Sequence, residues 1–117
     1  MTSSAPLRNQ LVRLRLAHGR LTGARVLLNS PIVQTNHNGG RILFGPDGML
    51  YAVVGDATDS SNAQDMEENR GKILRLTPNG GVPSDNPFDD RIWTYGHRNS
   101  FGFAFDPQTD ALWETEN

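Results

Sequence analysis

Two similar hairpin patterns, about 61 residues apart, constrain the fold of this chain more than any other feature. In the first, residues 41–54 form two apolar segments around the turn Gly45-Pro46-Asp47-Gly48. In the second, residues 102–115 form two such segments around Asp106-Pro107. Short apolar segments joined by Gly, Pro and Asp turns predict antiparallel hairpins. Their recurrence along one chain predicts a repetitive all-β architecture.

The segments that precede the two hairpins repeat as well. Leu14-Arg15-Leu16 recurs as Leu74-Arg75-Leu76, 60 positions later, and a glycine turn follows each of them. Residues 11–16 alternate apolar and basic side chains, which predicts a half-buried strand. Further strands are predicted at 25–28 and 91–95, and a short helix at about 63–69.

A repeat of this size, built from short strands, is typical of the blades of a β-propeller. A blade usually takes about 40–50 residues, so each unit has room for a long loop. We therefore expect residues 1–117 to form a partial β-propeller of roughly two blades. Two blades do not close a ring, and their open edges could pair with copies of the same chain. The alternative is a small stand-alone sandwich with two similar hairpins.

The composition excludes several classes of function. The chain carries 11 Lys and Arg against 13 Asp and Glu, a net charge of −2, so it offers no electrostatic footprint for nucleic acid. Cysteine is absent, which excludes disulfides, thiolate zinc sites and a cysteine nucleophile. No apolar run approaches the roughly 18 residues of a membrane span. The N-terminal residues lack the apolar core of a signal peptide.

The open end of the first hairpin brings His37 close to Asp56. In an antiparallel pair, the residues before the first strand meet the residues after the second. A carboxylate at this position can hold an imidazole in one tautomer, as a general base requires. His37 is therefore the candidate base and Asp56 its partner. Alternatively, each residue serves only its own turn.

The second hairpin adds polar groups to the same rim. At the offset of 61, Arg98 corresponds to His37 and Asn99 to Asn38. Equivalent loops of successive blades emerge on one face, so these side chains and Asp56 should line one surface. A base, a carboxylate, a cation and amides on one surface suit an active site. Arg98 could instead form a surface ion pair, which contributes little.

Three other polar features are interpreted as structural. His97 is expected to point the other way from Arg98 and to pack. His18 is expected to be solvated in its turn. The acidic residues 65–68 predict a solvated loop rather than a metal site.

The motifs of this chain resemble those of the soluble quinoprotein sugar dehydrogenases, the glucose/sorbosone or aldose sugar dehydrogenase family. In chain order they are Asn36-His37-Asn38-Gly39-Gly40-Arg41, Phe44-Gly45-Pro46-Asp47-Gly48-Met49-Leu50-Tyr51, Gly55-Asp56, Gly71-Lys72-Ile73-Leu74-Arg75-Leu76, Asp85-Asn86-Pro87-Phe88 and Tyr95-Gly96-His97-Arg98-Asn99. Each motif alone is weakly specific, whereas the ordered series is a specific signature. The resemblance extends from about Asn9 onward.

The resemblance implies a six-bladed propeller that oxidises an aldose sugar at its anomeric carbon. Hydride would pass to pyrroloquinoline quinone (PQQ), and an external acceptor would then take the electrons. His37 would be the general base and Asp56 the carboxylate that pairs with it. Arg98 and Asn99 would contact the cofactor.

Further expectations from the resemblance are a calcium ion beneath the quinone and a periplasmic or secreted location. No metal ligand is assigned within the chain, because the family's main calcium ligands correspond to positions beyond Asn117. Asn36 and Gln64 are weaker candidates for contact with the sugar.

The chain also departs from the family pattern. Family members are several times longer, and Phe101 stands where many relatives have Gln. The resemblance places the residues that hold calcium, and half of those that hold the cofactor, outside these 117 residues, so we expect the 117-residue chain alone to be inactive. Two alternatives remain: a non-catalytic binding module of the same fold, and a short chain that self-assembles into a propeller.

Overall fold

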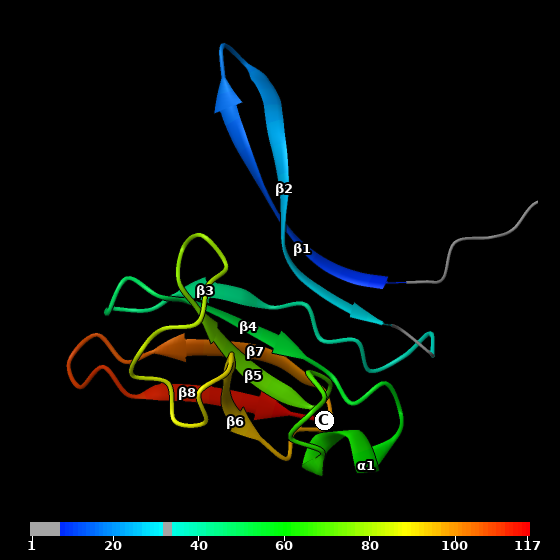
Figure 1. The fold of residues 1–117 in the computed structure, drawn as a ribbon. Coiled ribbons are helices and arrows are strands. Elements are labelled where there is room, and N and C mark those ends of the chain that lie inside the picture. The colour runs from blue at the N-terminus through cyan, green and yellow to red at the C-terminus, as the bar shows by residue number, and fades with distance from the viewer. Residues whose placement is uncertain (1–7, 32–33) are drawn as a thin grey trace, which may run out of the picture.

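The computed structural model describes residues 8–31 and 34–117, and these residues form three antiparallel sheets (Figure 1). The sheets contain strands β1–β2, β3–β4–β5–β6 and β7–β8. The elements are β1 (Arg8–Ala17), β2 (Arg20–Pro31), β3 (Ile42–Phe44), β4 (Leu50–Val54), α1 (Ser60–Gln64), β5 (Lys72–Leu76), β6 (Ile92–Tyr95), β7 (Ser100–Phe105) and β8 (Leu112–Glu116). The predicted all-β architecture is confirmed. The expectation about a signal peptide concerns residues 1–7, which lie outside the described residues.

The two predicted hairpins are confirmed. The pair Phe44 and Leu50 closes β3–β4, and the pair Phe105 and Leu112 closes β7–β8 in the same way. In the first turn, the Asp47 carboxylate accepts a hydrogen bond from the Met49 N–H at 3.0 Å. This local bond is why Asp suits the turn.

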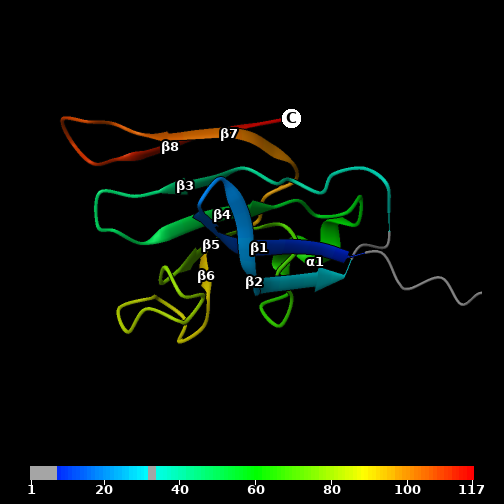
Figure 2. The ribbon, with the colours of Figure 1, turned by 90° about the horizontal axis from the view of Figure 1, so that it is seen from above.

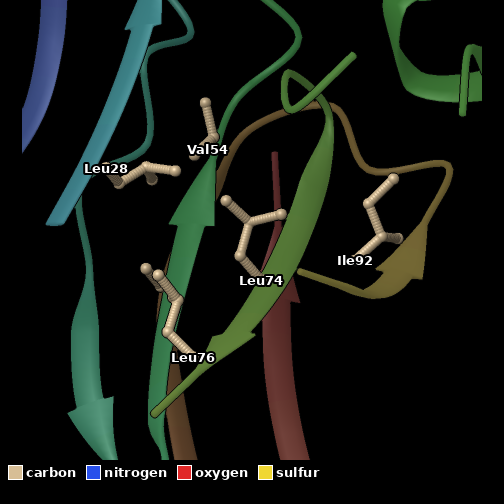
Figure 3. Close-up of a cluster of buried hydrophobic side chains, with 6 residues drawn as sticks. Leu28, Val54, Leu74, Leu76 and Ile92 are labelled. Atoms are coloured by element: carbon tan, nitrogen blue, oxygen red, sulfur yellow. The ribbon is translucent and has the colours of Figure 1, made fainter. Parts of the chain in front are cut away.

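Strands β4 and β5 are buried along their whole length because both faces of their sheet are covered. Alternate side chains of a strand point to opposite faces, so each strand supplies two cores. The core on one face consists of Leu28, Ala52, Val54, Leu74, Leu76 and Ile92 (Figure 3). The core on the other face is built on Tyr51, Val53, Ile73 and Phe103. The four-stranded sheet is thus packed between β2 and β7.

The β7–β8 hairpin covers one face of the four-stranded sheet and forms a separate layer in the view from above (Figure 2). Tyr51 and Phe105 meet across this seam with ring centroids 4.9 Å apart, and Leu112 packs into the same core. These contacts fix the position of the second hairpin relative to the first. They therefore also fix the relative positions of the loops at the open ends of the two hairpins.

The β1–β2 hairpin is longer than predicted and projects away from the sheets at its tip (Figure 1). The alternation in residues 11–16 correctly indicates a strand, but the half-burial expected from it is wrong. Leu14 is 46% and Leu16 71% exposed, because the described residues place no second layer over this part of the hairpin.

The helix begins and ends earlier than predicted, at 60–64 rather than 63–69. Asp59 is its N-cap, and the carboxylate accepts the Ser61 N–H at 3.0 Å, which satisfies an otherwise unpaired helix donor. Asp65 has an extended backbone and ends the helix. Among the described residues no helix is long and apolar enough to span a bilayer.

A buried arginine stabilises the turn end of the four-stranded sheet. The Arg75 side chain is 5% exposed and forms ion pairs with Asp47 at 2.9 Å and Asp85 at 2.7 Å. It also donates to the Tyr51 hydroxyl at 3.1 Å, and its guanidinium lies 4.9 Å from the centre of the Trp93 ring. Burial and the nearby Asp47 carboxylate raise the pKa of Tyr51 to about 12. The turn opposite the candidate site is therefore held by charge-assisted hydrogen bonds.

Candidate functional site

His37 and Asp56 meet at the open end of the β3–β4 hairpin, as predicted. His37 Nδ1 lies 3.0 Å from Asp56 Oδ1, and the same oxygen accepts the Thr58 N–H at 2.8 Å. The His37 side chain is 17% exposed and that of Asp56 only 6%. A neutral imidazole that donates from Nδ1 has its lone pair on Nε2. The pair therefore leaves His37 Nε2 able to accept a proton.

Two glycines allow the His37 loop to lie directly against the end of β4. A Cβ at Gly55 would lie 2.0 Å from the His37 carbonyl oxygen, and a Cβ at Gly39 would lie 2.7 Å from the Val53 oxygen. The His37 oxygen accepts the Ala57 N–H at 3.0 Å. His37 has a φ of 58°, in the left-handed region that side chains other than Gly rarely adopt. Surrounding contacts thus hold the candidate base in an unusual backbone conformation.

Arg98 and Asn99 reach the same place from the linker between β6 and β7. The Asp56 N–H donates to the Arg98 carbonyl oxygen at 2.8 Å, which joins this linker to the candidate base pair. The Arg98 guanidinium is exposed and donates to the Asn117 carbonyl oxygen at 2.6 Å. Asn99 is 6% exposed, and its side-chain amide forms no hydrogen bond with the part of the chain that the structure describes.

An open hollow of about 410 Å³ lies beside His37 and Asn99, and neither Asp56 nor Arg98 is among its lining residues. Its lining residues are Thr35, Asn36, His37, Asn38, Gly39, Asn99 and Phe101. The structure therefore brings the predicted residues Asn36, His37 and Asn99 together at one hollow. Gln64 is not among them, because it is exposed and lines a separate hollow with Met66, Glu67, Phe88, Asp90 and Tyr95.

The sequence reasoning missed a cluster of His97, Glu114 and Glu116, whose nearest ligand atoms all lie within 4.8 Å of one another. His97 Nδ1 lies 2.8 Å from Glu116 Oε1, and its Nε2 lies 2.7 Å from Thr94 Oγ1. His97 is half-buried, so the expected packing is right in part, but its partners are polar.

The repeat itself contains the signal for this cluster. At the offset of 62, Glu114 and Glu116 stand where the first hairpin has Ala52 and Val54. Ala52 and Val54 are core residues of the first hairpin. A carboxylate at a position where the equivalent residue of the first hairpin is apolar indicates that this residue forms polar contacts instead of packing in the core.

The family model for Glucose / Sorbosone dehydrogenase matches residues 2–117. The chain belongs to the glucose/sorbosone dehydrogenase family. Among curated members, "Aldose sugar dehydrogenase YliI" of Escherichia coli (strain K12) is 41% identical over 88 residues, which cover 70% of this chain and 24% of YliI. "Quinoprotein glucose dehydrogenase B" of Acinetobacter calcoaceticus is 33% identical over 100 residues, covering 66% of this chain and 21% of that protein.

The fold agrees with a solved structure of this glucose/sorbosone dehydrogenase family. The PQQ-bound form of Aldose Sugar Dehydrogenase (Adh) from Streptomyces coelicolor superposes with a TM-score of 0.86 at 38% sequence identity. The match covers 98% of this chain and 35% of that chain. The chain therefore spans about a third of the length of that relative, and the predicted fold, part of a β-propeller, is confirmed.

Proposed function

We propose that the protein carrying this chain is a PQQ-dependent dehydrogenase that oxidises an aldose sugar at its anomeric carbon. The observation that carries the proposal is His37, which lines an open hollow, is hydrogen-bonded through Nδ1 to the buried Asp56, and has no partner for Nε2 among the described residues. The names of YliI and of the PQQ-bound Streptomyces coelicolor enzyme support the reaction class. The binding module of the same fold remains the second candidate.

His37 acts as the general base in this proposal. Its Nε2 accepts the proton of the anomeric hydroxyl, so that the ring becomes an imidazolium. The Asp56 carboxylate, 3.0 Å from Nδ1, stabilises that positive charge and fixes the ring orientation. PQQ, when bound, supplies an electrophilic quinone carbon that accepts the hydride leaving the sugar.

Arg98 and Asn99 fit a role in holding the quinone. The Asn99 amide is almost buried, lines the hollow and lacks a partner among the described residues, so its polar atoms are available to a ligand. The exposed Arg98 guanidinium donates to the Asn117 carbonyl oxygen and does not line the hollow, so it would have to turn towards the hollow to stabilise negative charge on a quinone oxygen.

The geometry supports some of the remaining predictions about substrate and metal contacts better than others. Asn36 lines the same hollow and suits contact with the sugar, whereas Gln64 remains a prediction because its hollow is a separate one. The His97–Glu114–Glu116 cluster does not suit calcium, because that ion prefers oxygen ligands and the cluster includes an imidazole. A periplasmic or secreted location, an external electron acceptor and self-association through open strand edges remain proposals.

The test compares two histidines that share a left-handed backbone, His37 with φ 58° and His18 with φ 51°. Asn tolerates this conformation, so His37→Asn and His18→Asn are matched changes in the protein that carries this chain. We expect His37→Asn to lower kcat by about 10²- to 10⁴-fold while the dissociation constant of PQQ is unchanged. His18→Asn should alter neither quantity.

Near-normal turnover in His37→Asn would remove His37 from the mechanism. If the parent protein binds no PQQ, measured by quenching of its tryptophan fluorescence, the proposed function fails and the binding module takes its place.

A further inference from the structure

The Glu116 carboxylate contacts three residues at the start of β7 and just before it: His97, Arg98 and Ser100. The Arg98 N–H donates to both carboxylate oxygens, at 3.3 and 3.2 Å. His97 Nδ1 lies 2.8 Å away, and the Ser100 hydroxyl, whose hydrogen is directed mainly to the closer Glu114 carboxylate, lies 3.3 Å away. The bonds to charged acceptors are stronger than those to neutral ones. One side chain at the end of β8 therefore fixes the turn that contains Arg98 and Asn99.

The main chain of Arg98 extends this connection to the candidate base. Its N–H is held by Glu116, and its carbonyl oxygen accepts the Asp56 N–H at 2.8 Å. Asp56 in turn holds His37. A continuous hydrogen-bonded path thus runs from Glu116 to the imidazole, through the segment that carries both candidate cofactor contacts.

Glu114 provides an internal comparison. It lies two residues earlier on the same face of β8, and its carboxylate accepts from the Ser100 hydroxyl and lies 3.6 Å from His97 Nδ1. Its carboxylate accepts no hydrogen bond from Arg98 among the described residues. The side chains are similarly exposed, 25% for Glu114 and 32% for Glu116. The two glutamates differ in that only Glu116 accepts hydrogen bonds from the Arg98 main chain and from His97 Nδ1.

We propose that Glu116 is a positioning residue, which holds the Arg98–Asn99 segment and, through the Arg98 main chain, the Asp56–His37 pair. This inference rests on the proposed function for its relevance to PQQ, but the positioning itself does not need the cofactor. It assigns a task to a residue whose counterpart in the first hairpin is the core residue Val54.

The experiment compares Glu116→Gln with Glu114→Gln in the protein that carries this chain. Both variants lose one negative charge on the same face of β8. Hydrogen exchange, followed by mass spectrometry without quinone, is measured for peptides covering residues 53–59 and 96–101, with residues 72–76 as the reference. In Glu116→Gln, we expect both site peptides to exchange about 10-fold faster or more, while the reference peptide is unchanged. Glu114→Gln should leave the peptide covering residues 53–59 at the parent rate.

The second measurement is the dissociation constant of PQQ, obtained by fluorescence quenching. We expect Glu116→Gln to weaken PQQ binding by about 10- to 100-fold and Glu114→Gln by at most a few fold. Equal effects of the two variants, or faster exchange in the reference peptide as well, would mean a general loosening of the seam and would overturn the inference. Parent-like exchange in Glu116→Gln would overturn it too.

The two proposals fail in different ways. Absence of PQQ binding in the parent is a failure of the proposed function, whereas the exchange rates still decide whether Glu116 positions the segment.

Discussion

Replacement of Gly55 by alanine should displace the candidate base without touching any side chain of the site. Gly55 does not have a positive φ, so alanine can adopt its backbone conformation, and the cost is steric. The new Cβ would lie 2.0 Å from the His37 oxygen and 2.5 Å from its carbonyl carbon. Because real Cβ contacts essentially never fall below 3.0 Å, the His37 loop has to withdraw by about 1 Å.

The expected loss of stability combines two effects. Overpacking a close contact costs about 1–3 kcal/mol. The bond from the Ala57 N–H to the His37 oxygen, 3.0 Å in the parent, and the His37–Asp56 bond would weaken, at about 0.5–1.5 kcal/mol each. We therefore expect Gly55→Ala to lower the free energy of unfolding by about 2–6 kcal/mol. A displacement of the base by about 1 Å should also lower turnover by about 10²-fold.

Urea unfolding followed by circular dichroism measures the first effect, and Gly102→Ala is the matched control. Gly102 also lacks a positive φ, and a Cβ there would have Thr115 Oγ1 at 3.6 Å as its nearest neighbour, which is an ordinary contact. We expect the control to stay within about 0.5 kcal/mol of the parent. If Gly55→Ala is equally stable, the close approach of the His37 loop to Gly55 does not exist as described.

Two further predictions concern the charged pairs at either end of the four-stranded sheet. Arg75→Met should lower the free energy of unfolding by about 2–3 kcal/mol at pH 7, because buried acceptors such as the Tyr51 hydroxyl lose their donor. Against the opposing effect of burial, hydrogen bonds from Met49, Tyr51 and Arg75 lower the pKa of Asp47. The contribution of the ionised Asp47 carboxylate to stability is therefore present above about pH 4 and is lost as the pH falls through its folded-state pKa. In urea titrations, the difference in unfolding free energy between the parent and Arg75→Met should therefore shrink towards pH 2. A constant difference would contradict the role of Asp47. Asp56→Asn should lower kcat by about 10²- to 10⁴-fold without weakening PQQ binding. The rate of quinone reduction is measured by rapid mixing. An unchanged rate would exclude a role for the negative charge of Asp56.

The strands and the His37–Asp56 contact could be predicted because both depend on local rules. Turn residues define the ends of a hairpin, and antiparallel pairing then determines which residues meet at its open end. His37 and Asp56 are 19 positions apart, yet their hydrogen bond follows from the hairpin alone. The same rule, applied through the repeat, brought Asn99 to the hollow.

One feature that was missed depends on packing between sheets, which a single hairpin does not encode. The exposure of Leu16 depends on whether another layer covers the β1–β2 hairpin, and the alternation of its residues does not reveal this. The contact between Glu116 and His97, in contrast, forms at the open end of the β7–β8 hairpin, where Glu116 pairs with Ser100, so the same pairing rule could have found it. The helix position was misjudged for a local reason, since the Asp59 cap was overlooked in favour of the residues after it.

At position 98 the main chain, not the side chain, makes the structural link. The Arg98 N–H is bonded to Glu116, and the Arg98 carbonyl oxygen accepts the Asp56 N–H. Every amino acid other than proline supplies the same N–H and carbonyl group, so the link from Glu116 to Asp56 does not depend on which side chain stands there. The guanidinium, in contrast, is exposed and points outside this link. The side chain at position 98 can therefore be exchanged for any other except that of proline while the main-chain link from Glu116 to Asp56 stays in place.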